Sequence, residues 1–254
     1  MKTFNELEEF IINGDKVYLP HFSIECVIFG YENKQLKVLL TKLLGIGWGI
    51  PSGYIKQEEM LTAAATRILK ERTSIDNIFL KQFHIFGDSI YRSVQYNVDS
   101  TNYLPANSWL RQRTLSIGFY ALIDCAKAKI KQDYFVEDYK WVDINEIPND
   151  LLMDHNEIVT TALGTLRNQI FHEPIGFELL PEKFTLPEIQ TLYETILEKK
   201  FDRRHFPNKL LSLEIIEKLD EKRSIGQHRS PFLYKFHKDN YQNALNDRIA
   251  IAPN

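Results

Sequence analysis

The chain is poor in the features that mark several classes of protein. Its 254 residues include only two cysteines, Cys26 and Cys125, and both lie in apolar, strand-like runs. No disulfide or zinc framework is therefore implied, and we expect buried thiols in the reducing environment of the cytoplasm. No apolar run approaches the roughly 18 residues that a membrane-spanning helix needs. Residues 1–10 are acidic and contain no long apolar stretch, so we expect neither a signal peptide nor a membrane partner.

The chain also lacks an excess of positive charge. Lys and Arg number 31 against 34 Asp and Glu, which gives a formal net charge of −3. This balance excludes a protein that binds polyanions through bulk charge, so any contact with nucleic acid requires a local basic patch. The length suits two ordinary domains or one large domain.

A glycine-rich loop followed by an amphipathic helix dominates the first half of the chain. Gly45, Gly47, Gly49 and Gly53 fall within nine residues, which allows the backbone to turn sharply and to approach a ligand closely. From about Glu58 the apolar residues follow a helical period. The expected buried face consists of Leu61, Ala64, Ala65, Ile68 and Leu69. A plain surface helix packed on a sheet would show the same face, so the interpretation depends on the spacing of the charged residues.

The spacing of Gly53, Glu59, Arg67 and Glu71 resembles the Nudix box. In that box a Gly, a Glu, an Arg-Glu pair, a Glu-Glu pair and a final Gly recur at these intervals. The loop sequence PSGYI at 51–55 is similar to the family's Pro-Gly-Gly-Phe-Val. Three positions depart from the box: Ile68 and Arg72 stand where the family has Glu, and Ser74 stands where it has the last Gly.

These departures remove carboxylates that gather Mg²⁺ in a Nudix hydrolase. Positions 68, 71 and 72 share one helical turn, and Mg²⁺ requires oxygen ligands. Here the turn offers one carboxylate, Glu71, beside the guanidinium of Arg72, which stays protonated. A divalent ion about 4 Å from that guanidinium would be repelled by several kcal/mol. We therefore expect the Nudix fold without hydrolysis, with no catalytic residue, metal or cofactor. The alternative is that Arg72 points outward and other residues bind the metal.

The flanking segments predict the rest of a Nudix-type domain, assigned to residues 1–150. A short helix over 4–11 precedes a hairpin formed by 21–31 and 36–43 around Asn33 and Lys34. Further strands are expected at 77–88, 115–125 and 138–148. Residues 89–112 form a long polar loop, which is either functional or a floppy surface insertion. A helix over 155–170 either closes this domain or begins the next.

Residues 151–254 are assigned to a second domain. Thr185 and Glu188 have the spacing of a capping box, which predicts a helix to about Lys199. Asp202 is a candidate cap for a second helix that follows closely, and such a pair is typical of a helix-turn-helix. Residues 213–236 read as strand, basic turn and strand, the pattern of a wing. A helical appendage with a solvated charged face is the alternative.

The second half also carries the local positive charge that the whole chain lacks. Between Lys199 and Lys238 there are eleven Lys and Arg against five Asp and Glu, the kind of concentration that phosphate neutralisation needs. The order of helix, FDRRHF sequence, helix and basic hairpin resembles the C-terminal winged helix of the Nudix-related transcriptional regulators, in which Asp-Arg-Arg opens the recognition helix. Pro207 departs from this pattern and leaves the first residue of the helix open. The candidate DNA-binding residues are Arg203, Arg204, His205, Asn208, Lys209, Lys222, Arg223, His228 and Arg229.

The expected fold class is α+β, with an N-terminal Nudix-type mixed-sheet sandwich followed by a C-terminal winged helix-turn-helix domain. The resemblance implies a homodimeric transcriptional regulator, such as a repressor, on a palindromic double-stranded DNA operator. A small-molecule effector would bind the Nudix domain. It would be a sugar such as arabinose, a nucleotide sugar, or ADP-ribose. The lost metal ligands and the aromatic residues of the cleft favour a neutral sugar. The candidate effector-binding residues are Trp48, Tyr54, Glu59, Arg67, Glu71, Tyr91 and Arg92, with Tyr96 nearby in sequence.

Two other functions fit the same sequence. The first is a Nudix hydrolase of a nucleoside diphosphate derivative that carries an accessory C-terminal domain. The second is an inactive scaffold that binds a protein through the same winged helix. Mg²⁺-dependent product release would distinguish the first, and the absence of salt-dependent DNA binding would distinguish the second.

Overall fold

The computed structural model describes most of the chain as two compact units. The described residues are 4–43, 46–75, 79–89, 104–130, 136–170, 173, 178–202, 204–224 and 230–246. The first unit comprises Met1–Gly30, Lys37–Ile123 and Lys127–Ala162, and the second comprises Tyr31–Leu36, Asp124–Ala126 and Leu163–Asn254. Within the described ranges, no helix has both the length and the apolar character needed to cross a membrane.

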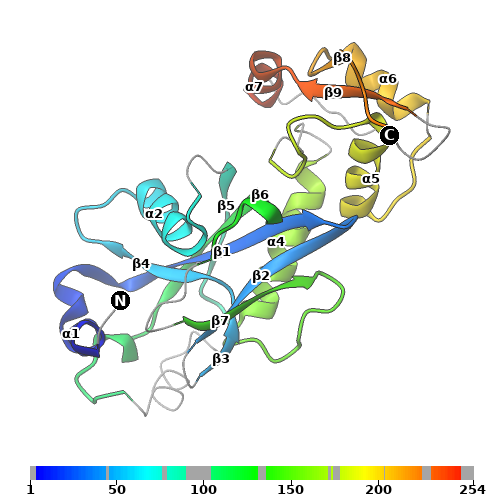
Figure 1. Ribbon diagram of the computed structural model, residues 1–254. Coiled ribbons are helices and arrows are strands. Elements are labelled where there is room, and N and C mark those ends of the chain that lie inside the picture. The colour runs from blue at the N-terminus through cyan, green and yellow to red at the C-terminus, as the bar shows by residue number, and fades with distance from the viewer. Residues whose placement is uncertain are drawn as a thin grey trace. The chain divides into compact units, whose positions relative to one another are not determined.

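The first unit is organised around one sheet (Figure 1). Its strands are β1 (Tyr18–Glu32), β2 (Gln35–Leu43), β3 (Gly47–Gly49), β4 (Ser52–Lys56), β5 (Phe79–Phe86), β6 (Leu115–Asp124) and β7 (Val136–Asp143). The main path runs β3-β2-β1-β6-β5, while β4 pairs with β1 and β7 pairs with β2. Each expected strand has a counterpart, but β7 ends at Asp143, so residues 144–148 of the strand expected over 138–148 lie outside it. The turn between β1 and β2 uses positive φ angles at Asn33 (52°) and Lys34 (63°), which confirms the predicted hairpin.

The helix of the Nudix box, α2 (Leu61–Thr73), packs on one face of this sheet. Its apolar residues share a core with alternate residues of the neighbouring strands. That core contains Ile24, Cys26, Ile28, Leu39, Ile55, Ala64, Ala65, Ile68, Leu69, Ile117, Phe119, Ala121 and Ile123. The helix ends at Ser74, whose φ of 60° lies in the left-handed region that favours glycine. A glycine, which the Nudix box has at this position, adopts such a φ angle without strain, whereas Ser74 adopts it at some cost.

Two further helices belong wholly or partly to the first unit. The N-terminal helix α1 (Phe4–Asn13) confirms the short helix expected over 4–11. It continues into a 3₁₀ turn, Gly14–Lys16. Helix α4 (His155–Gln169) passes behind the sheet in the view of Figure 1. Four apolar residues of this segment are fully buried: Ile158, Ala162, Leu166 and Ile170. The boundary between the units falls within α4, after Ala162.

The second unit contains the elements of a winged helix. They are α5 (Leu186–Leu197), α6 (His205–Ser212), β8 (Ile216–Lys222), β9 (Phe232–Phe236) and α7 (Lys238–Asn246). The capping box of Thr185 and Glu188 is present, as the sequence predicts, and β8 pairs antiparallel with β9. The inward face of α5 is buried, at Ile189, Leu192, Tyr193 and Ile196.

Short 3₁₀ turns lie at Trp109–Arg111 and Cys125–Lys127.

Candidate functional site

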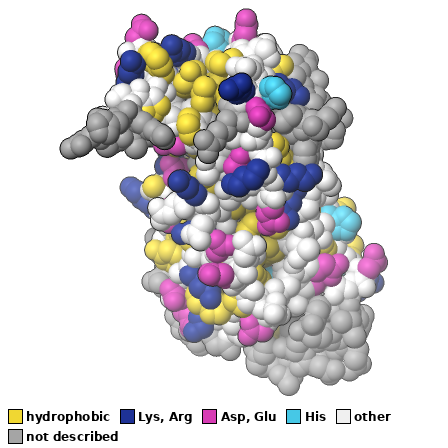
Figure 2. All heavy atoms as spheres, turned by 90° about the vertical axis from the view of Figure 1, so that its right-hand side faces the viewer, with side chains coloured by type: hydrophobic (Ala, Val, Ile, Leu, Met, Phe, Trp, Pro, Cys, Tyr) yellow, Lys and Arg dark blue, Asp and Glu magenta, His cyan; other side chains and the backbone are white. Residues whose placement is uncertain are grey.

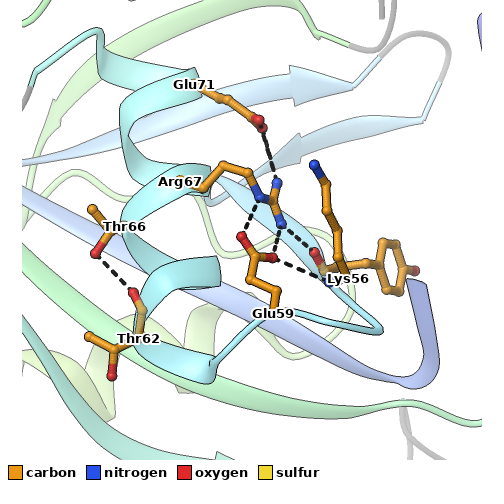
Figure 3. Close-up of polar contacts among 7 residues, drawn as sticks. Lys56, Glu59, Thr62, Thr66, Arg67 and Glu71 are labelled. Carbon is orange, nitrogen blue, oxygen red and sulfur yellow. Dashed lines mark hydrogen bonds and ion pairs between the residues drawn. The ribbon is translucent and has the colours of Figure 1, made fainter. Parts of the chain in front are cut away.

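The polar residues of the Nudix box that this chain retains, Glu59, Arg67 and Glu71, form one ion-pair network within the first unit (Figure 3). Arg67 donates from Nε to Oε1 of Glu59 and from Nη2 to Oε2 of Glu59, both at 2.8 Å. Its Nη2 also donates to the backbone oxygen of Tyr54 at 2.9 Å, and Nη1 lies 3.4 Å from both carboxylate oxygens of Glu71. The hydrogen bonds from Arg67 hold the pKa of Glu59 below its usual value, against the opposing effect of burial. These residues fix the loop between β4 and α2.

The positions that carry metal-binding glutamates in the Nudix box are chemically different here. Ile68 is 2% exposed and packs in the core. A Cβ built on Gly53 would lie 2.8 Å from its Cγ1. Glu71 instead has a side chain that is 57% exposed. Arg72 is half-buried. Burial, and to a lesser extent Glu25, raises the pKa of the Cys26 thiol to about 12, while the positive charge of Arg72 acts in the opposite direction. Among the residues that the structure describes, no group of three or more His, Cys, Asp or Glu side chains could hold a metal ion.

Tyr54, one of the candidate effector residues, belongs to an aromatic cluster. Its ring centroid lies 4.6 Å from that of Trp109, which stacks on Tyr18 at an interplanar angle of 6°. The Trp109 Nε1 donates to the backbone oxygen of Phe10 at 2.6 Å, and the Trp109 ring leaves no room for a Cβ on Gly14. The cluster therefore fastens α1 to the sheet. The sequence placed Trp109 in a long polar loop, where nothing indicated its burial.

Trp48 lies in β3, where its backbone pairs with Lys42 of β2. The ring is half-buried, and the ammonium group of Lys140 on β7 sits 4.2 Å from its centroid. The Lys140 ammonium group thus makes a cation–π contact with this ring and adds a positive charge beside it. The remaining effector candidates, Tyr91 and Arg92, together with Tyr96, lie outside the described residues.

The second helix of the winged unit, α6, has one buried and one exposed face. Phe206 and Leu210 are fully buried, and Phe206 stacks on Phe201 with an interplanar angle of 7°. Leu213, which follows the last residue of the helix, is half-buried. The opposite side holds Arg204, His205 and Asn208, all exposed, and the half-buried Lys209.

Asp202, the expected cap, lies two residues before the N-cap of α6, which is Arg204, and its carboxylate still bonds to the start of the helix. Its Oδ1 accepts hydrogen bonds from the backbone N–H groups of Arg204 (2.8 Å) and His205 (3.0 Å). These bonds hold the carboxyl pKa of Asp202 below its usual value. Pro207 falls in the first turn, where its missing N–H would have no intrahelical partner, so the helix begins at His205 without disruption. Arg203 lies outside the described residues.

The wing hairpin carries basic residues with different surroundings. Lys222 is exposed, and its ammonium lies 4.5 Å from the Phe232 ring centroid. Arg223 bonds within its own unit, from Nη1 to Glu188 at 2.6 Å and from Nη2 to the backbone oxygen of Lys183 at 2.7 Å. Arg223 therefore ties the wing to the start of α5. His228 and Arg229 lie outside the described residues. Basic side chains alternate with acidic ones on the face shown in Figure 2.

Comparisons with known proteins agree with this architecture. Residues 176–236 match the family described as the NrtR DNA-binding winged helix domain. The chain is 27% identical over 229 residues to the ADPR responsive transcriptional repressor NtrR of Acinetobacter baylyi, covering 87% of this chain and 84% of that protein.

Solved structures match most of the chain. NrtR of Shewanella oneidensis, complexed with a 27mer DNA, is 25% identical, with a TM-score of 0.69 over 87% of this chain and 95% of that one. A MutT/nudix family protein from Enterococcus faecalis shares the fold at 17% identity, with a TM-score of 0.61 over 93% of this chain and 99% of that one. The chain is therefore similar to NrtR proteins over most of its length, and its residues 176–236 match the winged helix domain of that family.

Proposed function

We propose that this protein is a DNA-binding transcriptional repressor controlled by a small molecule that binds its Nudix-like domain. The observation that carries the proposal is the likeness, along nearly the whole chain, to a structure of NrtR bound to DNA. The exposed polar side of α6, with Arg204, His205 and Asn208 on an apolar back, is the arrangement that a recognition helix needs. Such regulators read two half-sites as dimers, so we also propose a homodimer, which acts in the cytoplasm.

The effector that we propose is ADP-ribose or a close relative. The repressor of Acinetobacter baylyi is described as ADPR responsive, and it aligns with most of this chain. The positive charge of Lys140, 4.2 Å from the Trp48 ring centroid, also suits a negatively charged phosphate better than an uncharged pentose. A neutral sugar such as arabinose, which the sequence alone favours, becomes the second candidate.

The Nudix-like domain acts as a sensor and does not hydrolyse its ligand. Ile68 occupies a core position where a hydrolase has a metal-binding carboxylate, and the guanidinium of Arg72 stands in place of another. With these two carboxylates lost, the box keeps the Glu59–Arg67 pair that shapes the loop but lacks the oxygen ligands that Mg²⁺ needs. Binding without turnover is the property that a sensor requires, because the signal then persists while the ligand is present.

The test begins with a duplex selected by the protein from a random-sequence DNA library. Fluorescence anisotropy then measures the Kd of this operator with and without ADP-ribose, and arabinose serves as the comparison. We expect ADP-ribose to weaken operator binding by at least about fivefold, the lower end of usual allosteric coupling, and arabinose to have no effect. An effect of arabinose alone would transfer the proposal to the sugar. If no duplex is enriched at low salt, the repressor function is wrong and the scaffold function replaces it.

A further inference from the structure

A buried carboxylate lies beneath the start of α4, within the first unit. Glu25 is 4% exposed, and it alternates along β1 with Ile24 and Cys26, which face α2. Its Oε1 accepts hydrogen bonds from the hydroxyls of Ser23 (3.1 Å) and Ser116 (2.9 Å), while its Oε2 has no hydrogen-bond partner among the described residues. Burying such a group costs stability unless it is well paired. Packing alone therefore does not explain a glutamate at this position.

The group that faces this carboxylate is the ring of His155, the first residue of α4. Its Nε2 lies 3.5 Å from Oε2 of Glu25, and His155 is 5% exposed. The backbone N–H of Ile50 donates to Nδ1 of the same ring at 3.1 Å, so Nδ1 carries the lone pair. In the neutral ring the proton is consequently on Nε2, the nitrogen that lies 3.5 Å from Oε2 of Glu25. The ring is held from both sides.

The ring of His155 also contacts the glycine-rich loop, at Gly49. A Cβ added at Gly49 would lie 2.6 Å from Nδ1 of His155, so the ring rests directly on the β3 backbone. One residue earlier, the backbone oxygen of Trp48 accepts a hydrogen bond from the N–H of Leu152 at 2.8 Å, and Leu152 in turn accepts from the N–H of His155 at 3.0 Å. Residues 48–50 are therefore fastened to the residues that begin α4. A ligand that displaces this loop must also displace or strain the helix start.

Helix α4 belongs to both units, so a displacement of its first residues can be transmitted along the helix to the second unit. Its residues up to Ala162 belong to the first unit, and those from Leu163 onward belong to the second. We propose that His155, oriented by Glu25, is the positioning residue that transmits effector binding from the glycine-rich loop to the DNA-binding unit. This inference rests on the proposed function, because it assumes an effector at the loop and a response at the DNA.

The test uses the full chain, its selected operator and ADP-ribose. The variants are His155→Gln, which loses the Nδ1 acceptor, and Glu25→Gln, which loses the charge that orients the ring. Glu157→Gln is the matched control, since this glutamate lies in the first turn of α4 and is exposed. Calorimetry gives the Kd for ADP-ribose without DNA, and anisotropy gives the operator Kd with and without saturating ADP-ribose. The ratio of the two operator Kd values is the coupling factor.

We expect a coupling factor in the usual range, about 5- to 150-fold, for the wild type and for Glu157→Gln. His155→Gln and Glu25→Gln should still bind ADP-ribose and operator, with a coupling factor that falls to within about twofold of one. His155→Asn, whose Oδ1 takes the position of Nδ1, should retain more coupling than His155→Gln. Folded variants that bind both ligands and keep the wild-type coupling factor would overturn the inference.

A second measurement needs no variant. ADP-ribose should change the hydrogen exchange of the backbone amides at the start of α4, residues 155–162, in the wild-type protein. Unchanged exchange there, in a protein whose operator binding does respond to ADP-ribose, overturns the relay but leaves the proposed function intact. A wild-type protein whose operator binding ignores ADP-ribose instead contradicts the proposed function itself, and the relay falls with it.

Discussion

The guanidinium of Arg67 holds both carboxylate oxygens of Glu59 at 2.8 Å, and the two side chains are only 21% and 15% exposed. This paired, part-buried geometry depends on the planar fork of arginine. Arg67→Lys should therefore keep the charge but lower the free energy of unfolding by about 1–3 kcal/mol. Urea unfolding measures the change. Thr66→Ala is the control, because that exposed hydroxyl bonds only to the backbone oxygen of Thr62, and this variant should be near neutral (Figure 3).

The same pair predicts a pH dependence of stability. Hydrogen bonding by Arg67 lowers the pKa of Glu59 from its ordinary value of 4.5. A carboxyl whose pKa is lower in the folded state contributes stability above the unfolded pKa and loses it as the pH falls through the folded pKa. The wild type should therefore lose stability more steeply than Glu59→Gln as the pH falls below about 4.5. Unfolding free energies between pH 7 and pH 3 provide the comparison, and parallel curves would contradict the assignment.

The Nudix-like domain should be catalytically silent. With Ile68 in the core and Arg72 replacing a glutamate, Mg²⁺ lacks two of the carboxylates that bind it in the family. ADP-ribose incubated with the protein and Mg²⁺ or Mn²⁺ should yield AMP no faster than with Glu71→Gln, as measured by chromatography. Faster release by the wild type would restore the hydrolase alternative.

The elements of both domains could be predicted because they are encoded by local patterns. The turn at Asn33 and Lys34, the capping box at Thr185 and the two-faced α6 each follow from residues close in sequence. The combination of a Nudix-type domain with a winged helix also followed, since the spacing of the box survives the loss of its metal ligands.

Contacts between distant segments could not be predicted in this way. His155 meets Glu25 across 130 positions, and Trp109 meets Phe10 across 99, which only the folded sheet brings about. The single hint for the first contact was a charged residue within the apolar run of β1. Likewise, the sequence could not show that Arg223 bonds to Glu188, because an exposed arginine and an ion-paired one look alike in a list of residues.

Effector binding should depend on Trp48. Its ring is half-buried beside the glycine-rich loop and is faced by the Lys140 ammonium. Trp48→Ala should abolish the thermal shift that ADP-ribose produces, which is expected to reflect about 2.7 kcal/mol at a ligand concentration of 100 Kd. Operator binding without ADP-ribose should be unchanged. A variant that loses both properties would show that the ring is needed for folding, and the effector would then bind elsewhere.

The final prediction separates reading of DNA sequence from attachment to the DNA backbone. Arg204 and Asn208 are exposed on α6, and arginine pairs with guanine and asparagine with adenine, each at about 1–3 kcal/mol of discrimination. Lys222 is exposed on the wing strand, where a lysine more often contacts phosphate, which positions the protein without reading bases. Replacement of residues from the two groups should therefore weaken binding in different ways.

Arg204→Ala and Asn208→Ala should reduce affinity for the selected operator far more than affinity for a scrambled duplex. Lys222→Ala should weaken both about equally and reduce the slope of log affinity against log salt by about one. Arg223→Lys should instead lower thermal stability, because Arg223 bonds to Glu188 and to the Lys183 backbone within its own unit. Anisotropy at several salt concentrations on both duplexes gives these quantities. If Arg204→Ala and Asn208→Ala weaken operator and scrambled DNA alike, α6 does not read the sequence, and that role passes to another element.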